Sequence, residues 1–287
     1  MKQILAGIFL AHISLGAELK SFVADWENYR LRIDVQLDRS QLEDQHNLLH
    51  IRDRLKEECL LAISDVLEKM PVDNSYKLGD LLLRYPDFAS TYAQFLRSLE
   101  LQRFLQEGAI FSAGLDIPLR GPRGLLGILP LPYGRLRYEG LQEAEYVSEA
   151  YLLNRVQGEY LPRAARQAYS GLLIDVRSLP FSPSLAPRIF SQEGRLIYGP
   201  EYLSFQAVRQ RALAGFFQST EHPEVERRVG KKPFFVVPLD LRGKQRTDVV
   251  LAEEDVQELF AHPETLRNLQ KTRVVFLVAS ERKISLP

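Results

Sequence analysis

Cysteine, tryptophan and methionine are scarce in this chain of 287 residues, which contains one, one and two of them respectively. A single cysteine, Cys59, excludes an intramolecular disulfide and any metal site built from several cysteines. Cys59 lies within LKEECLLAISDVL, whose spacing predicts a helix, and we expect a small buried apolar side chain there. A free catalytic thiol is the alternative, but nothing in the surrounding sequence favours a thiolate.

An excess of charge of either sign is also lacking, because Lys and Arg together number 37 and Asp and Glu together number 37. A chain with a formal net charge of zero has no overall electrostatic attraction to nucleic acid or to an anionic membrane. We therefore expect no nucleic-acid partner. Beyond the amino terminus, no apolar run approaches the roughly 20 residues that a membrane-spanning helix needs, so we expect no transmembrane span in the mature chain.

The amino terminus has the layout of a secretory signal peptide. Lys2 is followed by an apolar segment, Ile4 to Leu15, and then by small residues around Gly16 and Ala17. We expect cleavage there and a periplasmic location. No cysteine stands at this cleavage point, so a lipid anchor is not expected. A buried first element of a cytosolic domain is the alternative, and His12 within the apolar run favours it.

The next part of the chain mixes strand and helix patterns. Trp26 to Leu37 alternates apolar and polar residues, which predicts a half-buried strand. Leu48 to Met70 has apolar residues three or four apart, which predicts a long helix that ends before Pro71. Lys77 to Leu105 contains two further helical stretches, and Ala109 to Leu119 alternates again. This order is typical of an α+β module.

Glycine and proline are concentrated between Gly121 and Gly134, which predicts a loop and a domain boundary. We expect four parts: a signal peptide (1–17), an amino-terminal α+β module (18–121), a linker with a helix at Glu139 to Arg155 (122–168) and a carboxy-terminal α+β module (169–287). In the last part we expect a helix from about Tyr202 to Gln218, strands at Phe234 to Leu241, Asp248 to Leu251 and Thr272 to Ala279, and a helix at Ala252 to Phe260. The last strand should be central, and Pro238 should lie at an edge or bulge.

The most distinctive stretch is GLLIDVRSLPFSPSLAPRIFSQEGRLIYG, from Gly171 to Gly199. It begins with a short apolar strand and continues through a segment of three prolines that should run extended. Arg188 to Ser191 and Arg195 to Tyr198 flank a short loop that ends in Gly194, which predicts a bulged hairpin.

Motifs with a catalytic or metal-binding chemistry are weak. His46 and His50 have helical spacing, but no third metal ligand accompanies them, and solvent-exposed histidines are the simpler interpretation. The glycines of 121–127 precede a proline-rich stretch that does not begin a helix, which disfavours a phosphate site. Asp175 and Arg177 share a strand face, where a structural ion pair is favoured over a catalytic dyad. We expect no enzyme activity, cofactor or metal.

Two groups of side chains are candidates for binding a partner. The first is a basic cluster that could hold an anionic partner such as a glycan, with a solvated loop as the alternative: Arg227, Arg228, Lys231 and Lys232. The second is a set of aromatic residues that would anchor a protein partner, with a place in the core as the alternative: Phe181, Phe190 and Tyr198.

The Gly171 block resembles a group of exported bacterial envelope proteins, in which a GL(I/L)(I/V)DAR strand precedes P-x-L-x-P-(R/K)-I and a DG-x-x-(V/I)-Y-G hairpin. Their amino-terminal module is similar to small outer-membrane lipoproteins of the FlgP type and to the first domain of the flagellar-ring protein FlgT. The matching places here are residues 25–35, 48–70 and 114–121. The resemblance implies no catalytic residues.

Together these observations predict an α+β protein of two modules, each a small mixed sheet packed against helices. We expect a non-enzymatic periplasmic protein of the cell envelope that acts structurally or in assembly by binding other proteins. The resemblance implies partners in the envelope, among them the flagellar apparatus, and we also consider a homo-oligomer. An envelope protein that binds glycan, peptidoglycan or another ligand is the alternative.

Overall fold

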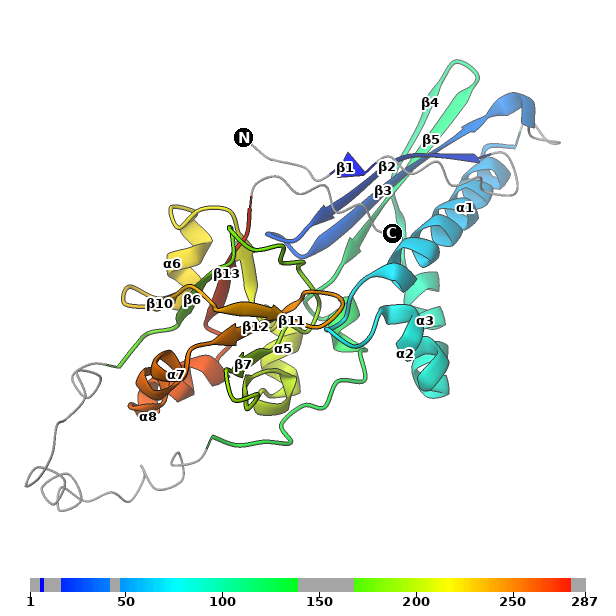
Figure 1. The fold of residues 1–287 in the computed structure, drawn as a ribbon. Coiled ribbons are helices and arrows are strands. Elements are labelled where there is room, and N and C mark those ends of the chain that lie inside the picture. Colours follow the sequence, from blue (N-terminus) through cyan, green and yellow to red (C-terminus); the bar gives the residue numbers. More distant parts are fainter. Residues whose placement is uncertain (1–5, 8–16, 42–46, 139–167, 280–287) are drawn as a thin grey trace, which may run out of the picture. The chain divides into compact units, whose positions relative to one another are not determined.

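The fold is described from a computed structural model, which covers residues 6–7, 17–41, 47–138 and 168–279 in detail (Figure 1). The chain forms two compact units. Unit 1 contains residues up to Val72 and Tyr76 to Pro130, and unit 2 contains Leu131 to Ala279 together with Asp73–Ser75. The fold is therefore α+β in two parts, as the sequence predicts.

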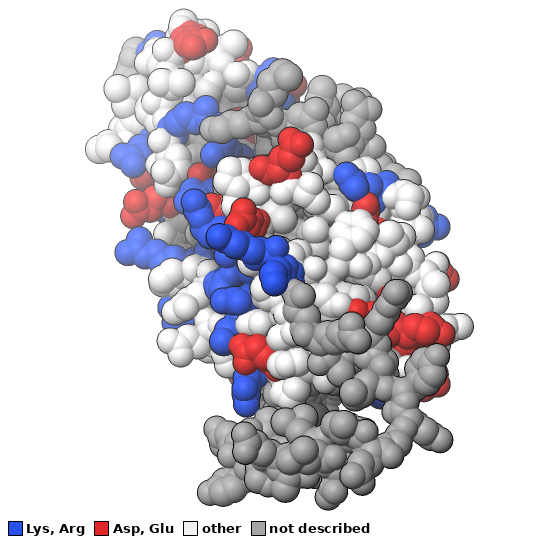
Figure 2. Space-filling model, turned by 90° about the vertical axis from the view of Figure 1, so that its left-hand side faces the viewer, with Lys and Arg blue, Asp and Glu red and all other residues white. Residues whose placement is uncertain are grey.

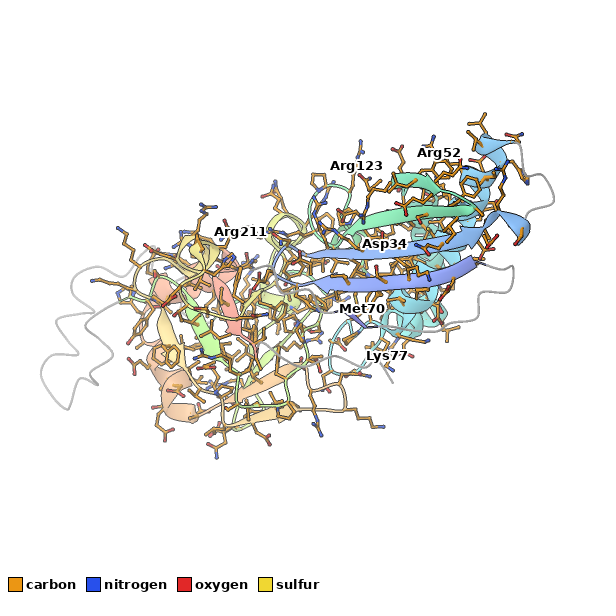
Figure 3. The ribbon with its side chains drawn as sticks, turned by 90° about the horizontal axis from the view of Figure 1, so that it is seen from above. Asp34, Arg52, Met70, Lys77, Arg123 and Arg211 are labelled. Carbon is orange, nitrogen blue, oxygen red and sulfur yellow. The ribbon has the colours of Figure 1, made fainter. Side chains whose placement is uncertain are left out.

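Unit 1 is built on an antiparallel sheet with the strand order β1-β2-β3-β5-β4. Its strands are β1 (Ala6–Gly7), β2 (Ala17–Asp25), β3 (Arg30–Asp38), β4 (Leu101–Glu107) and β5 (Ile110–Pro118). Alternate residues of β3 are buried, which confirms the amphipathic strand that the alternating pattern predicts. Asp34 of β3, labelled in Figure 3, lies between them and pairs with Arg103 of β4 at 2.9 Å.

Three α-helices are described in unit 1: α1 (Leu48–Lys69), α2 (Leu78–Arg84) and α3 (Pro86–Arg97). Asn47 caps α1 by accepting hydrogen bonds from the backbone N–H groups of Leu49 and His50. The buried face of α1 packs on β3 and β5, which confirms the long helix predicted from the apolar spacing. Cys59 lies on this face and is fully buried.

Unit 2 contains a parallel sheet with the order β10-β6-β13-β9. Its strands are β6 (Leu172–Asp175), β9 (Gly215–Phe217), β10 (Phe234–Val236) and β13 (Val274–Leu277). All four residues of β13 are buried, so the apolar run at the end of the chain is a central strand, as predicted. Among the described strands, β10 and β9 are the outermost of this sheet.

A second, mixed sheet of unit 2 has the order β11-β12-β7-β8. Its strands are β7 (Ile189–Ser191), β8 (Leu196–Tyr198), β11 (Asp240–Arg242) and β12 (Asp248–Leu251). The predicted hairpin is confirmed by the antiparallel pairing of β7 with β8, which has an irregular register. Gly194 in its loop has a φ of 82°, a left-handed conformation that favours glycine.

Four helices of unit 2 are described: α5 (Phe205–Arg211), α6 (Pro223–Val229), α7 (Glu253–Phe260) and α8 (Pro263–Gln270). Helix α6 covers one face of the parallel sheet, where Val225 and Val229 pack with Leu173, Val275 and Leu277. This cluster determines which part of the sheet is shielded from solvent.

Two predictions for unit 2 are wrong. The expected helix from Tyr202 to Gln218 ends at Arg211, because Ala212 takes a φ of 60° and the chain then enters β9. The expected strand from Phe234 to Leu241 divides at Pro238 into β10 and β11, which belong to different sheets. Pro238 lacks a backbone donor, so it suits this division next to an edge strand.

Other predictions fall on residues that the structure does not describe. These are most of the predicted signal peptide and the predicted helix at Glu139 to Arg155. Of the two histidines with helical spacing, His46 lies outside the described residues, and His50 is exposed on α1.

Candidate functional site

An exposed row of apolar side chains begins on β10, one of the two outer strands of the parallel sheet, and continues past the end of that strand. Phe235, Val237 and Leu239 are 51%, 54% and 54% exposed, and we call these three residues the β10 row. Phe234, which precedes them, and Val236 and Pro238, which lie between them, are buried. Burial therefore alternates along the strand and the turn after it, so large apolar groups face solvent on one side.

The β10 row was not identified from the sequence. The stretch PFFVVPLDL is apolar almost throughout, so the pattern cannot tell an outward side chain from an inward one. The proline at its centre was the available signal, because it places the segment at a sheet edge. An apolar row at an edge strand is a typical surface for binding a protein segment.

The predicted basic cluster is only partly on the surface. Lys231 and Lys232 are exposed and are separated from β10 by Pro233, and Arg227 is exposed and forms an ion pair with Glu224. Figure 2 shows basic side chains with acidic ones beside them on the face that it draws, so charge of one sign does not dominate that face. A strong general anion site is not favoured by this mixture.

Arg228 corrects the prediction of an anion-binding cluster, because it is only 8% exposed. Its guanidinium donates to the backbone carbonyls of Arg211 at 2.7 Å, Ala212 at 2.9 Å and Thr272 at 3.0 Å. Ala212 and Thr272 both have positive φ values, 60° and 58°. Arg228 thus holds together two turns in an unfavourable backbone conformation, which is a structural role.

The predicted aromatic anchors lie mainly in the core. Phe181 is 8% exposed and stacks on Phe276 with ring centres 5.0 Å apart. Tyr198 is fully buried, and its hydroxyl donates to the carbonyl of Leu213 at 2.6 Å. Both are therefore corrected from partner anchors to core residues. Phe190 is half-buried beneath the guanidinium of Arg242, 4.2 Å from the ring centre.

A largely buried ionic cluster lies elsewhere in unit 2, centred on Arg188. Its guanidinium contacts Asp73 at 2.6 Å and Glu201 at 2.9 Å. Burial opposes the charge of Arg188, but the hydrogen bonds and charges of Glu201 and Asp73 outweigh it and raise the pKa of Arg188. Breaking such a pair from one side leaves an uncompensated buried charge, so the cluster fixes local structure.

Asp248 is the third carboxylate of this cluster and is 1% exposed. It accepts hydrogen bonds from the backbone N–H of Arg188 and from the hydroxyl of Thr247, both at 3.1 Å. Burial nevertheless raises the pKa of Asp248 to about 6. A raised carboxyl pKa also occurs at catalytic sites, but here the hydroxyl that contacts the carboxylate, that of Thr247, is fully buried and out of reach of a substrate. The predicted ion pair of Asp175 with Arg177 is confirmed at 2.6 Å.

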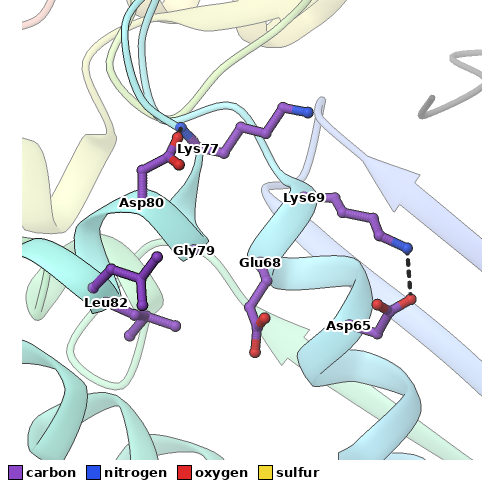
Figure 4. A pocket seen from close by; sticks show the side chains of 8 residues that line it. Asp65, Glu68, Lys69, Lys77, Gly79, Asp80 and Leu82 are labelled. Carbon is purple, nitrogen blue, oxygen red and sulfur yellow. Dashed lines mark hydrogen bonds and ion pairs between the residues drawn. The ribbon is translucent and has the colours of Figure 1, made fainter.

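The surface of unit 1 has an open hollow of about 480 Å³ between α1 and α2 (Figure 4). Charged side chains dominate its lining, and Lys69 is bound to Asp65 at 2.8 Å.

Within the described ranges, no group of three acidic, histidine or cysteine side chains is arranged to hold a metal ion. Burial raises the pKa of Cys59 to about 12, which disfavours a reactive thiolate. Among the described helices, none has the length and apolar character to cross a membrane.

Residues 171–280 match the family model of the second domain of Treponema pallidum Tp0624. The match begins at Gly171, the first residue of the distinctive block, and includes the β10 row and Arg228. No curated protein matches the chain. The comparison thus relates the larger part of unit 2 to this domain, and it does not extend to unit 1.

Proposed function

We propose that this protein is a non-enzymatic component of the bacterial cell envelope that acts in assembly by binding other proteins through the β10 row. The observation that carries the proposal is the exposure of Phe235 on the edge strand β10, and of Val237 and Leu239 just after the end of that strand. An edge strand offers backbone hydrogen bonds, and its alternate side chains offer apolar contacts, so the two together can bind an extended segment.

The envelope location is supported by the signal-peptide pattern at the amino terminus and by the resemblance of the Gly171 block. The resemblance to FlgP and FlgT favours partners in the flagellar apparatus. The proline segment after β6 is a weaker candidate surface than the β10 row, because residues 183–187 are buried.

The first experiment locates the protein. Cells that express the full-length chain are fractionated, and the mature amino terminus is determined by mass spectrometry. We expect a periplasmic protein that begins near Gly16 or Ala17. An intact Met1 in the cytoplasm would contradict the envelope part of the proposal.

The second experiment tests the surface. A photo-reactive amino acid is placed at Val237 and, as a matched control, at Leu105 of β4, because both side chains are 54% exposed. We expect cross-linked adducts with defined envelope proteins at Val237 and few or none at Leu105. Equal adducts at both positions, or none at Val237, would contradict the assignment of the β10 row as the binding surface.

A further inference from the structure

The four strands of the parallel sheet begin at the same edge of that sheet, which we call the amino edge. Strands β10 and β13 pair parallel with β6, and β9 pairs parallel with β13, so their amino ends lie side by side. Helices α5, α6 and α8 directly precede β9, β10 and β13 in the chain. The carboxy-terminal ends of these three helices therefore lead into the amino edge.

Hydrogen bonds join the loops of the amino edge into one surface. The backbone N–H of Ser170 donates to the carbonyl of Lys232 at 2.9 Å, and its hydroxyl accepts from the N–H of Lys232 at 3.0 Å. On the other side of β6, the guanidinium of Arg273 donates to the carbonyl of Ser170 at 3.4 Å. Arg228 connects the loops before β13 and β9 through the carbonyls described above. The charges on these loops are thus held close together.

The loops of the amino edge carry basic residues and no acidic ones. They are residues 168–171, 211–214, 230–233 and 271–273, and none of these is Asp or Glu. Lys231, Lys232 and Lys271 are exposed, and none of the three forms an ion pair with a described residue. Lys231 and Lys232 lie beyond Gly230, the residue that ends α6, so the dipole of this helix accounts for little of their placement.

The amino edge is continuous with the β10 row. Only Pro233 separates Lys232 from Phe234, the first residue of β10. At about 3.3 Å per residue of extended chain, Lys232 lies within about 10 Å of Phe235 along the strand direction. An extended segment bound along β10 therefore has one of its ends beside Lys231 and Lys232, whichever direction it runs.

The mixture of charges around the amino edge distinguishes between anionic partners. Glu224 and Glu264 lie on the helices that lead into the edge, where they pair with Arg227 and Arg267. Figure 2 likewise shows acidic side chains beside basic ones on the face that it draws. A uniformly anionic membrane or polysaccharide would meet these carboxylates as well as the lysines. A protein segment with a few carboxylates can place them opposite the lysines alone.

We propose that the partner segment that binds the β10 row is acidic at the end that passes the amino edge, where its carboxylates bind Lys231 and Lys232. Lys271 adds to the attraction from the other side of Ser170. The inference rests on the proposed function in that the β10 row is the binding surface, and it states the chemistry of the partner. The apolar residues of the segment contact the row, and its carboxylates determine which segments bind.

The test uses the purified full-length chain and fluorescent peptides of alternating threonine and valine. Three glutamates follow at the carboxy end of one peptide and precede at the amino end of another, because a segment can pair with β10 in either direction. We expect one of them to bind, as measured by fluorescence anisotropy, and to bind more weakly as salt is added. The same peptide with three glutamines should bind at least about tenfold more weakly.

Two variants with the same change in net charge test the position of the carboxylates. Lys232→Glu should weaken binding of the glutamate peptide at least about tenfold. Lys244→Glu, at an exposed lysine in the turn between β11 and β12, should change it less than about twofold. Circular dichroism of each variant checks that the fold is intact.

Four outcomes overturn the inference. Neither glutamate peptide binds, the glutamine peptides bind as tightly, or the two lysine variants weaken binding equally, which would indicate an effect of net charge alone. The fourth outcome is that vesicles of phosphatidylglycerol sediment with the wild type and not with Lys232→Glu, which would identify a membrane as the partner.

Phe235→Ser separates this inference from the proposed function. Loss of peptide binding in Phe235→Ser as well as in Lys232→Glu supports both. Cross-linked adducts at Val237 with a defined envelope protein that Lys232→Glu leaves unchanged would keep the proposed function and overturn the acidic partner. Peptide binding that depends on Lys232 and not on Phe235 would keep an acidic partner for the amino edge and reject the β10 row as the binding surface.

Discussion

Asp248 makes the stability of unit 2 depend on pH in a direction opposite to that of most paired carboxylates. Its pKa rises from an ordinary value of 3.8 to about 6 because burial outweighs the hydrogen bonds and the positive charge of Arg188, and the carboxylate of Asp73 adds to the rise. The folded state therefore binds a proton at Asp248 more tightly than the unfolded state does. The stabilisation of the folded state by protonated Asp248 is fully present below about pH 4, and it is lost as the pH rises through about 6.

The size of this effect follows from the pKa difference. A difference between 3.8 and about 6 is worth about 3 kcal/mol in the free energy of unfolding at pH 8. The substitution Asp248→Asn keeps an oxygen that accepts from the Arg188 backbone and from Thr247, and it removes the charge. We expect the variant to be more stable than the wild type by up to about 3 kcal/mol at pH 8 and about equally stable at pH 4.

The assay is urea unfolding followed by circular dichroism from pH 4 to pH 8. Hydrogen exchange of peptides that contain β12, measured by mass spectrometry, locates the effect in unit 2. The only tryptophan, Trp26, lies in unit 1, so its fluorescence reports whether unit 1 is affected. If the stability difference between variant and wild type is the same at every pH, the reasoning is refuted.

Three further predictions test other features. Arg228→Met should lower the free energy of unfolding by about 3 kcal/mol or more, because three carbonyls lose their donor and two of these hydrogen bonds are buried. Arg227→Met on the exposed side of the same helix should lower it by less than about 0.5 kcal/mol, and urea unfolding compares the two variants. Gly243→Ala should lower the free energy of unfolding clearly more than Gly194→Ala. Both glycines have a φ near 80°, but only at Gly243 would the added carbon overlap another side chain. Equal losses in urea unfolding would contradict this. Cys59 should resist alkylation at pH 8 in the folded protein and react after urea unfolding, as measured by mass spectrometry; rapid labelling of the folded protein would show that the thiol is accessible.

The elements that the sequence predicts well are those with a strong local signal. Helix α1 has a long apolar period and ends next to Pro71, and the β7–β8 hairpin has a loop with a glycine in the required position. Strand β13 is apolar throughout and short, which predicts a central strand. In each case the residues that determine the structure lie within the element itself.

The elements that were missed depend on distant parts of the chain. Whether Phe235 is covered depends on how far α6 reaches across the sheet, and no local pattern contains that distance. Arg228 belongs to a residue type that is usually exposed, but its partners are carbonyls from two turns, at Ala212 and Thr272. Strand β9 contains only Gly215–Phe217, so the apolar residues before it favoured a longer helix.

The assignment of Asp73–Ser75 to unit 2 has a consequence for the order of events during folding. Asp73 is synthesised 115 residues before its partner Arg188, while the rest of unit 2 begins at Leu131. Because closing so long a loop is entropically costly, this ion pair forms late, after local elements such as α1 and the β7–β8 hairpin. A fragment that begins at Leu131 would lack Asp73 altogether and leave Arg188 with one fewer carboxylate. Unit 2 is thus continuous in space but not in the chain. It is complete only when Asp73, which is synthesised first, has paired with Arg188.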